Sequence, residues 1–141
     1  MSKKIDFETL KIGDSIPELV KEPITRTQLA LFAGASGDHN PIHLDDAEAQ
    51  AGGLDGVIAH GMLNMAFLGQ VLTEWLPQRA VRSFSTRFAA MAYPGDVITC
   101  KGVVSGKVKE KGENLLELDL LAENQNGEIL LKGNATVAVK S

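Results

Sequence analysis

The chain has 141 residues, of which 44% are hydrophobic and 23% charged, and its net charge is −4. This length and composition predict a single soluble globular domain over residues 1–141, and they exclude a collagen-like or intrinsically disordered chain. The acidic balance argues against a nucleic-acid partner, and the single cysteine, Cys100, suits a reducing compartment such as the cytoplasm.

The first predicted strand spans residues 15–22, where Pro17 indicates an edge position or a bulge because proline cannot donate to a sheet. Thr25 stands three residues before a glutamine, a spacing typical of the capping box that opens a helix. Two glycines, Gly34 and Gly37, are expected to end the short helix that follows.

A long helix is predicted over residues 60–76, after a polar connection over residues 37–56 that is long enough to be functional. Apolar residues occur almost all the way round this helix, which is typical of a helix buried on most sides. At about 1.5 Å per residue it would be about 25 Å long, and Pro77 ends it. Polar residues such as His60 and Glu74 interrupt its apolar run, so no membrane span is expected.

After Pro77 the apolar period changes to two, which is typical of half-buried strands. Turn residues over 93–96 and the Asn126-Gly127 pair indicate where the chain reverses. The strands so predicted span residues 83–90, 97–104, 116–122 and 129–139. Consecutive strands joined by tight turns pair antiparallel, and a sheet that must cover one buried helix has to curl around it. The sequence therefore predicts an α+β architecture, with a curled antiparallel sheet wrapped around one long central helix.

Residues 36–43, Ser-Gly-Asp-His-Asn-Pro-Ile-His, bring an acid, an amide and two imidazoles together. One interpretation is a capped turn, in which the Asp38 and Asn40 side chains bond to nearby backbone and the proline fixes the bend. A second interpretation is a metal site built from Asp38, His39 and His43. We expect no metal there, because the intervening proline breaks the helix that would place both imidazoles on one face.

An acid–base pair is the third interpretation of this segment. A loop can bring Asp38 and His43 to one point, where they would hold a water molecule, one group accepting a proton while the other donates one. The start of the long helix adds to this interpretation, because the N–H groups at His60-Gly61-Met62 and the helix dipole can stabilise an oxyanion such as a thioester enolate. The alternatives are that Gly61 only permits close helix–sheet packing and that His60 is a buried histidine bonded to backbone.

Residues 36–43, followed by Ile-Ala-His-Gly-Met over residues 58–62, resemble the MaoC-like dehydratase family. That family includes (R)-specific enoyl-CoA hydratases and (3R)-hydroxyacyl-ACP dehydratases. The resemblance continues through shorter matches at residues 12–14, 24–26 and 93–96, so it covers most of the chain.

The resemblance implies a hot-dog fold in a homodimer, with the substrate tunnel near the interface between the two copies. It also implies reversible hydration of a trans-2-enoyl thioester to an (R)-3-hydroxyacyl thioester in fatty-acid metabolism, without a cofactor or a metal. Asp38 and His43 would be the catalytic pair that activates one water, and the Gly61 N–H would polarise the thioester carbonyl. The other residues assigned to substrate binding are Asn40, His60 and Met62.

Several features of the substrate are left open by the sequence. The thioester carrier is either CoA or ACP, and Arg79, Arg82 and Arg87 are either contacts to this carrier or solvated side chains. Some relatives place a serine seven or eight residues after the glycine, where this chain has Leu68 and Gly69. Two other functions remain as alternatives, a non-catalytic substrate-binding subunit of a heterodimeric dehydratase and a hot-dog acyl thioesterase.

Overall fold

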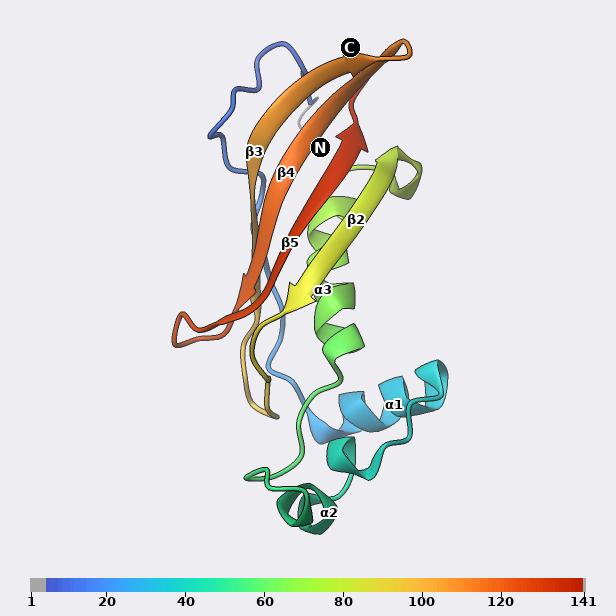
Figure 1. The fold of residues 1–141 in the computed structure, drawn as a ribbon, viewed down its shortest axis with the longest axis vertical. Coiled ribbons are helices and arrows are strands. Elements are labelled where there is room, and N and C mark those ends of the chain that lie inside the picture. Colours follow the sequence, from blue (N-terminus) through green and yellow to red (C-terminus); the bar gives the residue numbers. More distant parts are fainter. Residues whose placement is uncertain (1–4, 141) are drawn as a thin grey trace.

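Five antiparallel strands curl around one helix in the computed structural model, which describes residues 5–140 (Figure 1). The strands lie in the order β1-β3-β4-β5-β2. Their bounds are β1 (Leu19–Val20), β2 (Val81–Phe88), β3 (Thr99–Glu110), β4 (Glu113–Glu123) and β5 (Ile129–Ala138). The helices are α1 (Arg26–Ser36), α2 (Asp46–Ala51) and α3 (Gly61–Thr73), with 3₁₀ turns η1 (Pro41–His43) and η2 (Gln78–Ala80). The predicted α+β architecture, with a curled sheet and a central helix, is confirmed.

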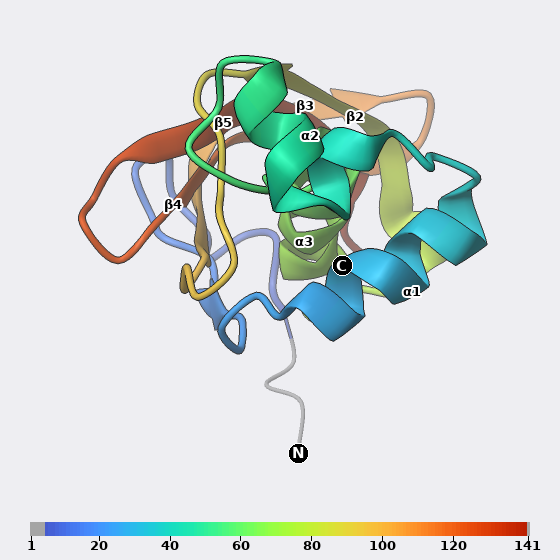
Figure 2. The same ribbon diagram turned by 90° about the horizontal axis from the view of Figure 1, so that it is seen from below.

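The helices α1 and α2 gather at the N-terminal end of α3, beyond the end of the sheet (Figure 1). Seen from that end, they lie across the start of the central helix (Figure 2). None of the helices described here has both the length and the apolar character needed to cross a bilayer.

The central helix α3 is buried on one side and open on the other. Leu68 and Val71 belong to the same buried core as Leu116 and Leu118 of β4. On the opposite side Met62 is 57% exposed, so the prediction of a helix buried on most sides is only partly right. The reason is geometric, because a sheet that is curled but not closed leaves one side of the helix uncovered.

The bounds of α3 also differ from the predicted residues 60–76. The helix begins at Gly61 and ends at Thr73, after which the N–H of Leu76 still donates to the carbonyl of Leu72. The last turn tightens, because the N–H of Trp75 also donates to the Leu72 carbonyl, and Pro77, which has no N–H, cannot extend the helix further.

The short helix α1 begins as predicted, since the Thr25 hydroxyl accepts from the N–H of Gln28 at 3.1 Å. Gly34 does not end this helix, which continues to Ser36. Gly37 ends it with a φ of 79°, a left-handed conformation that glycine adopts without strain.

The predicted connection over residues 37–56 contains η1 and α2. Helix α2 begins after Asp45, whose carboxylate accepts from the N–H groups of Ala47 and Glu48. An aspartate three residues before a glutamate is itself a helix-start signal, and it identifies α2 in the sequence.

The edge strand β1 has two residues, where the sequence predicted residues 15–22. Ser15 makes an isolated bridge to Val103, and Pro17 separates this bridge from β1. The strand lies at the edge of the sheet, as Pro17 predicted, because its missing N–H would break the ladder of an inner strand.

The hairpin between β3 and β4 is longer than predicted. Strand β3 continues to Glu110, six residues past the expected end at residue 104, and Lys111-Gly112 turn the chain with φ values of 50° and 77°. The other hairpin prediction is confirmed, since Asn126-Gly127 connect β4 to β5 and Gly127 has a φ of 76°.

Strands β2 and β5 approach closely at Ser85 and Gly133, and this contact can be tested by substitution. A Cβ added at Gly133 would lie 2.5 Å from the backbone oxygen of Ser85, a contact that only a backbone shift relieves. We therefore expect Gly133→Ala to lower the free energy of unfolding by about 1–3 kcal/mol. In the matched control Gly34→Ala the new Cβ meets no atom within 4 Å, and the better helix propensity should raise stability by up to about 1 kcal/mol. Urea unfolding measures both, and equal stabilities for the two variants would contradict the close approach.

Candidate active site

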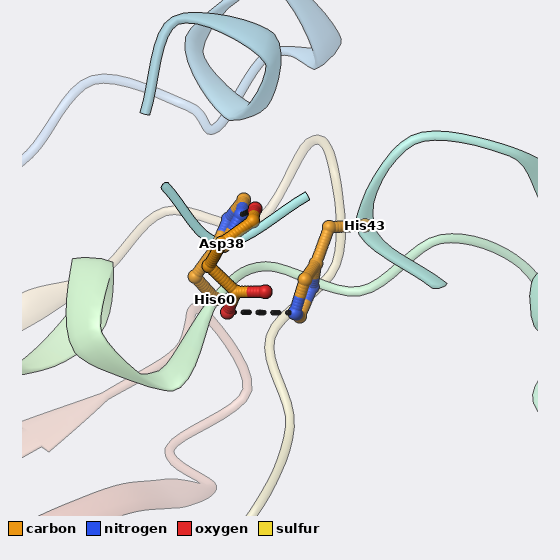
Figure 3. A group of neighbouring side chains, drawn as sticks. All are labelled: Asp38, His43 and His60. Atoms are coloured by element: carbon orange, nitrogen blue, oxygen red, sulfur yellow. Dashed lines mark hydrogen bonds and ion pairs between the residues drawn. The ribbon is translucent and has the colours of Figure 1, made fainter. Parts of the chain in front are cut away.

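Three segments bring polar side chains to the N-terminal end of α3. Asp38 follows the end of α1, His43 is the last residue of η1, and His60 is the N-cap residue of α3. Figure 3 shows the Asp38 carboxylate directed toward the edge of the His43 ring, with the His60 ring beside them. The predicted pair, Asp38 and His43, is therefore brought together.

The loop that carries Asp38 is held by its own side chains. The Asp38 carboxylate accepts from the N–H of Asn40 at 3.2 Å, and the Asn40 side-chain oxygen accepts from the N–H of Ile42 at 3.2 Å. Pro41 begins η1, where its missing N–H leaves no donor unpaired. The capped-turn interpretation thus describes the loop correctly, and Asn40 orients it. The same turn points the second Asp38 oxygen toward His43.

The tautomer of His43 follows from its partner. The ring Nδ1 lies 2.8 Å from the carbonyl oxygen of Ile58, which can only accept, so Nδ1 carries the proton of the neutral ring. The lone pair of that ring is then on Nε2, which lies 3.6 Å from Asp38 Oδ2. This distance is longer than a direct hydrogen bond. The His43 side chain is buried and that of Asp38 is half-exposed, so the pair is reached from the Asp38 side.

His60 contacts both members of this pair. Its Nε2 donates to the backbone carbonyl of Asp38 at 3.2 Å, and its ring stacks on His43 with 3.9 Å between centroids. The edge of Phe32 from α1 packs on the same ring. Burial lowers the pKa of His60, which keeps the ring neutral. His60 is thus buried and bonded to backbone, as one of its two sequence interpretations predicts.

Gly61 is the first residue of α3 and has a packing role. A Cβ added there would lie 3.0 Å from the Phe88 ring, so the glycine lets the end of β2 approach the helix. The first N–H groups of a helix have no acceptor within it, which leaves those of Gly61 and Met62 available at the positive end of the helix dipole. Packing and anion stabilisation are both compatible with this glycine.

A metal ion fits this cluster poorly. Donor atoms of Asp38, His43 and His60 lie within 4.8 Å of one another. The metal interpretation of the sequence named His39 in place of His60, and His39 lies outside this cluster. The two rings are stacked with 21° between their planes, so their in-plane lone pairs lie in two separate, nearly parallel planes and do not meet at one ion. Both rings also bond to a backbone carbonyl. The residues therefore lack the convergent donor set that zinc requires.

One residue important for the site is missed by sequence reasoning. Asp46 accepts from Arg26 at 2.6 Å and from the N–H of Val57 at 3.0 Å, and so ties the first turns of α1 and α2 to the segment that leads to α3. The next residue of that segment, Ile58, carries the carbonyl that fixes His43. The only sequence signal is the capping aspartate next to Asp46, which marks the start of α2 but not its contacts.

Two of the arginines considered as carrier contacts, Arg79 and Arg82, lie away from Asp38 and His43. Two hollows, of about 800 and about 670 Å³, are lined by the C-terminal end of α3 and its surroundings, not by Asp38 or His43. Arg79 and Arg82 line the larger hollow, which lies past the C-terminal end of α3, and the helix itself spans about 20 Å from Gly61. Arg82 pairs with Glu113, so its charge is already compensated.

Comparison with known proteins identifies the family. The sequence profile described as "MaoC like domain" matches residues 8–125. The chain belongs to the MaoC-like family. An (R)-specific enoyl-CoA hydratase from Rhodospirillum rubrum is 33% identical over 135 residues, which cover 94% of this chain and 90% of that protein.

Solved structures support the same MaoC-like assignment. The R-hydratase PhaJ1 from Pseudomonas aeruginosa has a TM-score of 0.83 and 29% identity, with 98% of this chain and 88% of that chain covered. The (R)-hydratase from A. caviae, described as involved in PHA biosynthesis, has a TM-score of 0.81 and 27% identity, with 94% and 99% covered. These likenesses confirm the predicted hot-dog fold.

The hydrogen bonds of Asp46 to Arg26 and Val57 predict that the contribution of Asp46 to stability depends on pH. The Val57 N–H and then the Arg26 guanidinium hold the pKa of Asp46 below its ordinary value of 3.8. A folded-state pKa below the unfolded value adds stability above the unfolded pKa, and this stability is lost as pH falls through the folded pKa. We expect Asp46→Asn to be less stable than the wild type at pH 7, with a difference that shrinks as the pH falls below about 3.8. Urea unfolding across this range measures the difference, and a gap independent of pH would contradict the role of the charge.

Proposed function

We propose that this MaoC-family hydratase/dehydratase adds water to the C2=C3 bond of a trans-2-enoyl thioester and releases an (R)-3-hydroxyacyl thioester. Dehydration is the reverse of the same reaction. One observation carries the proposal: two acceptors, the Asp38 carboxylate and the His43 Nε2, lie 3.6 Å apart beside the start of α3. A water molecule has two hydrogens, and one bound beside both acceptors can donate to each of them.

The chemistry of hydration follows from that arrangement. With both hydrogens engaged, a lone pair of the water oxygen is directed at C3 of the substrate. As the C3–O bond forms, one O–H bond breaks and its proton passes to the Asp38–His43 pair, while the electrons of C2=C3 move to the thioester oxygen. The pair then returns a proton to C2, so one water is added and the enzyme is regenerated. We assign both proton transfers to the pair as a unit, because both groups face the same water molecule.

The enolate oxygen needs a partner while the negative charge is on it. We place it at the N–H of Gly61, where the dipole of α3 adds to the hydrogen bond. This assignment is supported by the position of Gly61, which directly follows His60 in the chain while His60 bonds to the Asp38 carbonyl. The two halves of the reaction, attack at C3 and charge at the carbonyl, would thus be served by two segments that His60 holds together.

We propose CoA as the thioester carrier and a homodimer as the working form. The CoA assignment rests on the similarity to the hydratase from R. rubrum, whose name specifies an enoyl-CoA. The dimer is supported by apolar side chains exposed next to the site, Met62 of α3 and Phe88 of β2, both more than half exposed. Strand β2 is also the last strand of the sheet formed by residues 5–140, so its outer edge can pair with a second copy.

The decisive variants change Asp38 and His43, and a control variant changes the nearby His39. Asp38→Asn and His43→Gln each remove one proton acceptor, and we expect each to lower kcat for crotonyl-CoA hydration by about 10²–10⁴-fold while folding is retained. The matched control is His39→Gln, because His39 is an exposed histidine of the same loop, outside the cluster, and its replacement should leave kcat within about twofold of the wild type. Loss of enoyl absorbance measures the rate, and chiral analysis of the product should give the (R) form.

The other outcomes of this assay are equally informative. Wild-type rates in Asp38→Asn or His43→Gln would reject the assigned roles. Release of free thiol without loss of enoyl absorbance would indicate a thioesterase. Turnover that appears only after a second subunit is added would indicate a substrate-binding subunit, and a clear preference for the crotonyl-ACP thioester would replace CoA as the carrier.

A further inference from the structure

We propose that His60 is a positioning residue, whose single imidazole holds Asp38 by its edge and His43 by its face and so sets the geometry of the catalytic pair. The inference rests on the proposed function, because it assigns to His60 the arrangement of the two groups that activate water. It gives His60 no contact with the substrate, since the residue is buried, with 1% of its surface exposed.

Two different parts of the ring make the two contacts. The Nε2–H donates to the backbone carbonyl of Asp38 at 3.2 Å, which holds the loop next to α3. The ring face stacks on His43, with centroids 3.9 Å apart and 21° between the planes, which leaves His43 little freedom to rotate. Asp38 and His43 are five residues apart in the loop, and one ring from another segment fixes both.

The orientation of His60 is itself determined. Phe32 packs on its ring edge-on, with 4.8 Å between centroids, and the backbone of His60 forms the N-cap of α3. Since the Asp38 carbonyl only accepts, Nε2 must carry the proton, and Nδ1 holds the lone pair of the neutral ring. Burial lowers the pKa of His60, so this uncharged form persists beside His43 when His43 takes up a proton.

The buried Nδ1 argues for a role beyond filling space. Within residues 5–140 no hydrogen-bond partner reaches His60 Nδ1, and a buried polar atom without a partner lowers stability. An aromatic hydrocarbon ring would fill the same volume without that cost. What a hydrocarbon ring cannot do is donate to the Asp38 carbonyl, so this donation accounts for an imidazole at this place.

The consequence for catalysis is a matter of distance. The Asp38 carboxylate and His43 Nε2 must stay close enough for one water molecule to reach both, and a displacement of about 1 Å can cost about a hundredfold in rate. Because His60 directly precedes Gly61 in the chain, the same residue also relates the pair to the helix end that would receive the enolate charge.

Two substitutions separate the two contacts. His60→Phe keeps a ring face for His43 and removes the donor to the Asp38 carbonyl, whereas His60→Gln keeps a donor and removes the ring. We expect each to lower kcat for crotonyl-CoA hydration by about tenfold with KM within about twofold, and His60→Ala, which loses both contacts, to lower kcat by about a hundredfold. Val71→Ala, a core truncation in the same helix, is the control for loss of stability alone and should lower the apparent kcat only in proportion to its folded fraction.

A second measurement reports the geometry without activity. In proton NMR spectra the stacked ring should shift the His43 Cε1–H signal upfield in the wild type and in His60→Phe, and the shift should disappear in His60→Gln. The chain has three histidines, so His39→Gln and His60→Phe assign the signals.

The outcomes distinguish this inference from the proposed function. Wild-type kcat in His60→Phe and His60→Gln, or a His43 signal without the upfield shift in the wild type, overturns the positioning role even if Asp38→Asn and His43→Gln are inactive. A kcat that falls only in proportion to the folded fraction, as Val71→Ala calibrates it, overturns it as well. If the His60 variants do not fold, the wild-type NMR signal still decides. Full hydration activity in Asp38→Asn and His43→Gln would instead reject the proposed function itself.

Discussion

The hydrogen bond between His43 Nδ1 and the Ile58 carbonyl is the interaction on which the site depends. Because a carbonyl can only accept, this one contact fixes the tautomer of the ring, and therefore the direction of its free lone pair. The lone pair points toward the Asp38 carboxylate, which makes the two groups a pair of acceptors at one point. Asp46 and Arg26 fix the segment that supplies the carbonyl, and His60 fixes the ring from the other side. The geometry of the Asp38–His43 pair thus depends on hydrogen bonds within the loop and on contacts from other segments of the chain.

Much of the fold can be predicted from the sequence because its signals are local. The Thr25 cap, the Asn126-Gly127 turn and the two-residue period after Pro77 depend on neighbours in the chain, and the structure agrees with each. The errors arise where a local pattern is ambiguous or incomplete. The apolar residues around α3 predict burial on most sides, but a sheet of five strands leaves Met62 exposed. The glycine at position 34 is compatible with a helix that continues, and α1 continues past it.

The site is predictable only in part, for the same reason. Asp38, His43 and Gly61 follow from the resemblance of two segments to the MaoC-like family, and the structure brings the first two together. The contacts of His60 and of Asp46 join residues far apart in the chain, so no periodicity or spacing indicates them. The extent of the domain, the cytoplasmic location and the homodimer stay predictions.

The most direct test is a crystal structure of the Asp38→Asn variant with (R)-3-hydroxybutyryl-CoA bound. The account predicts that the 3-hydroxyl oxygen lies between the side chain at position 38 and His43 Nε2, within hydrogen-bond distance of both, and that the thioester oxygen faces the N–H of Gly61. A 3-hydroxyl group bound away from His43, or a thioester oxygen directed away from the start of α3, would contradict the claim that these residues act on one water and one carbonyl.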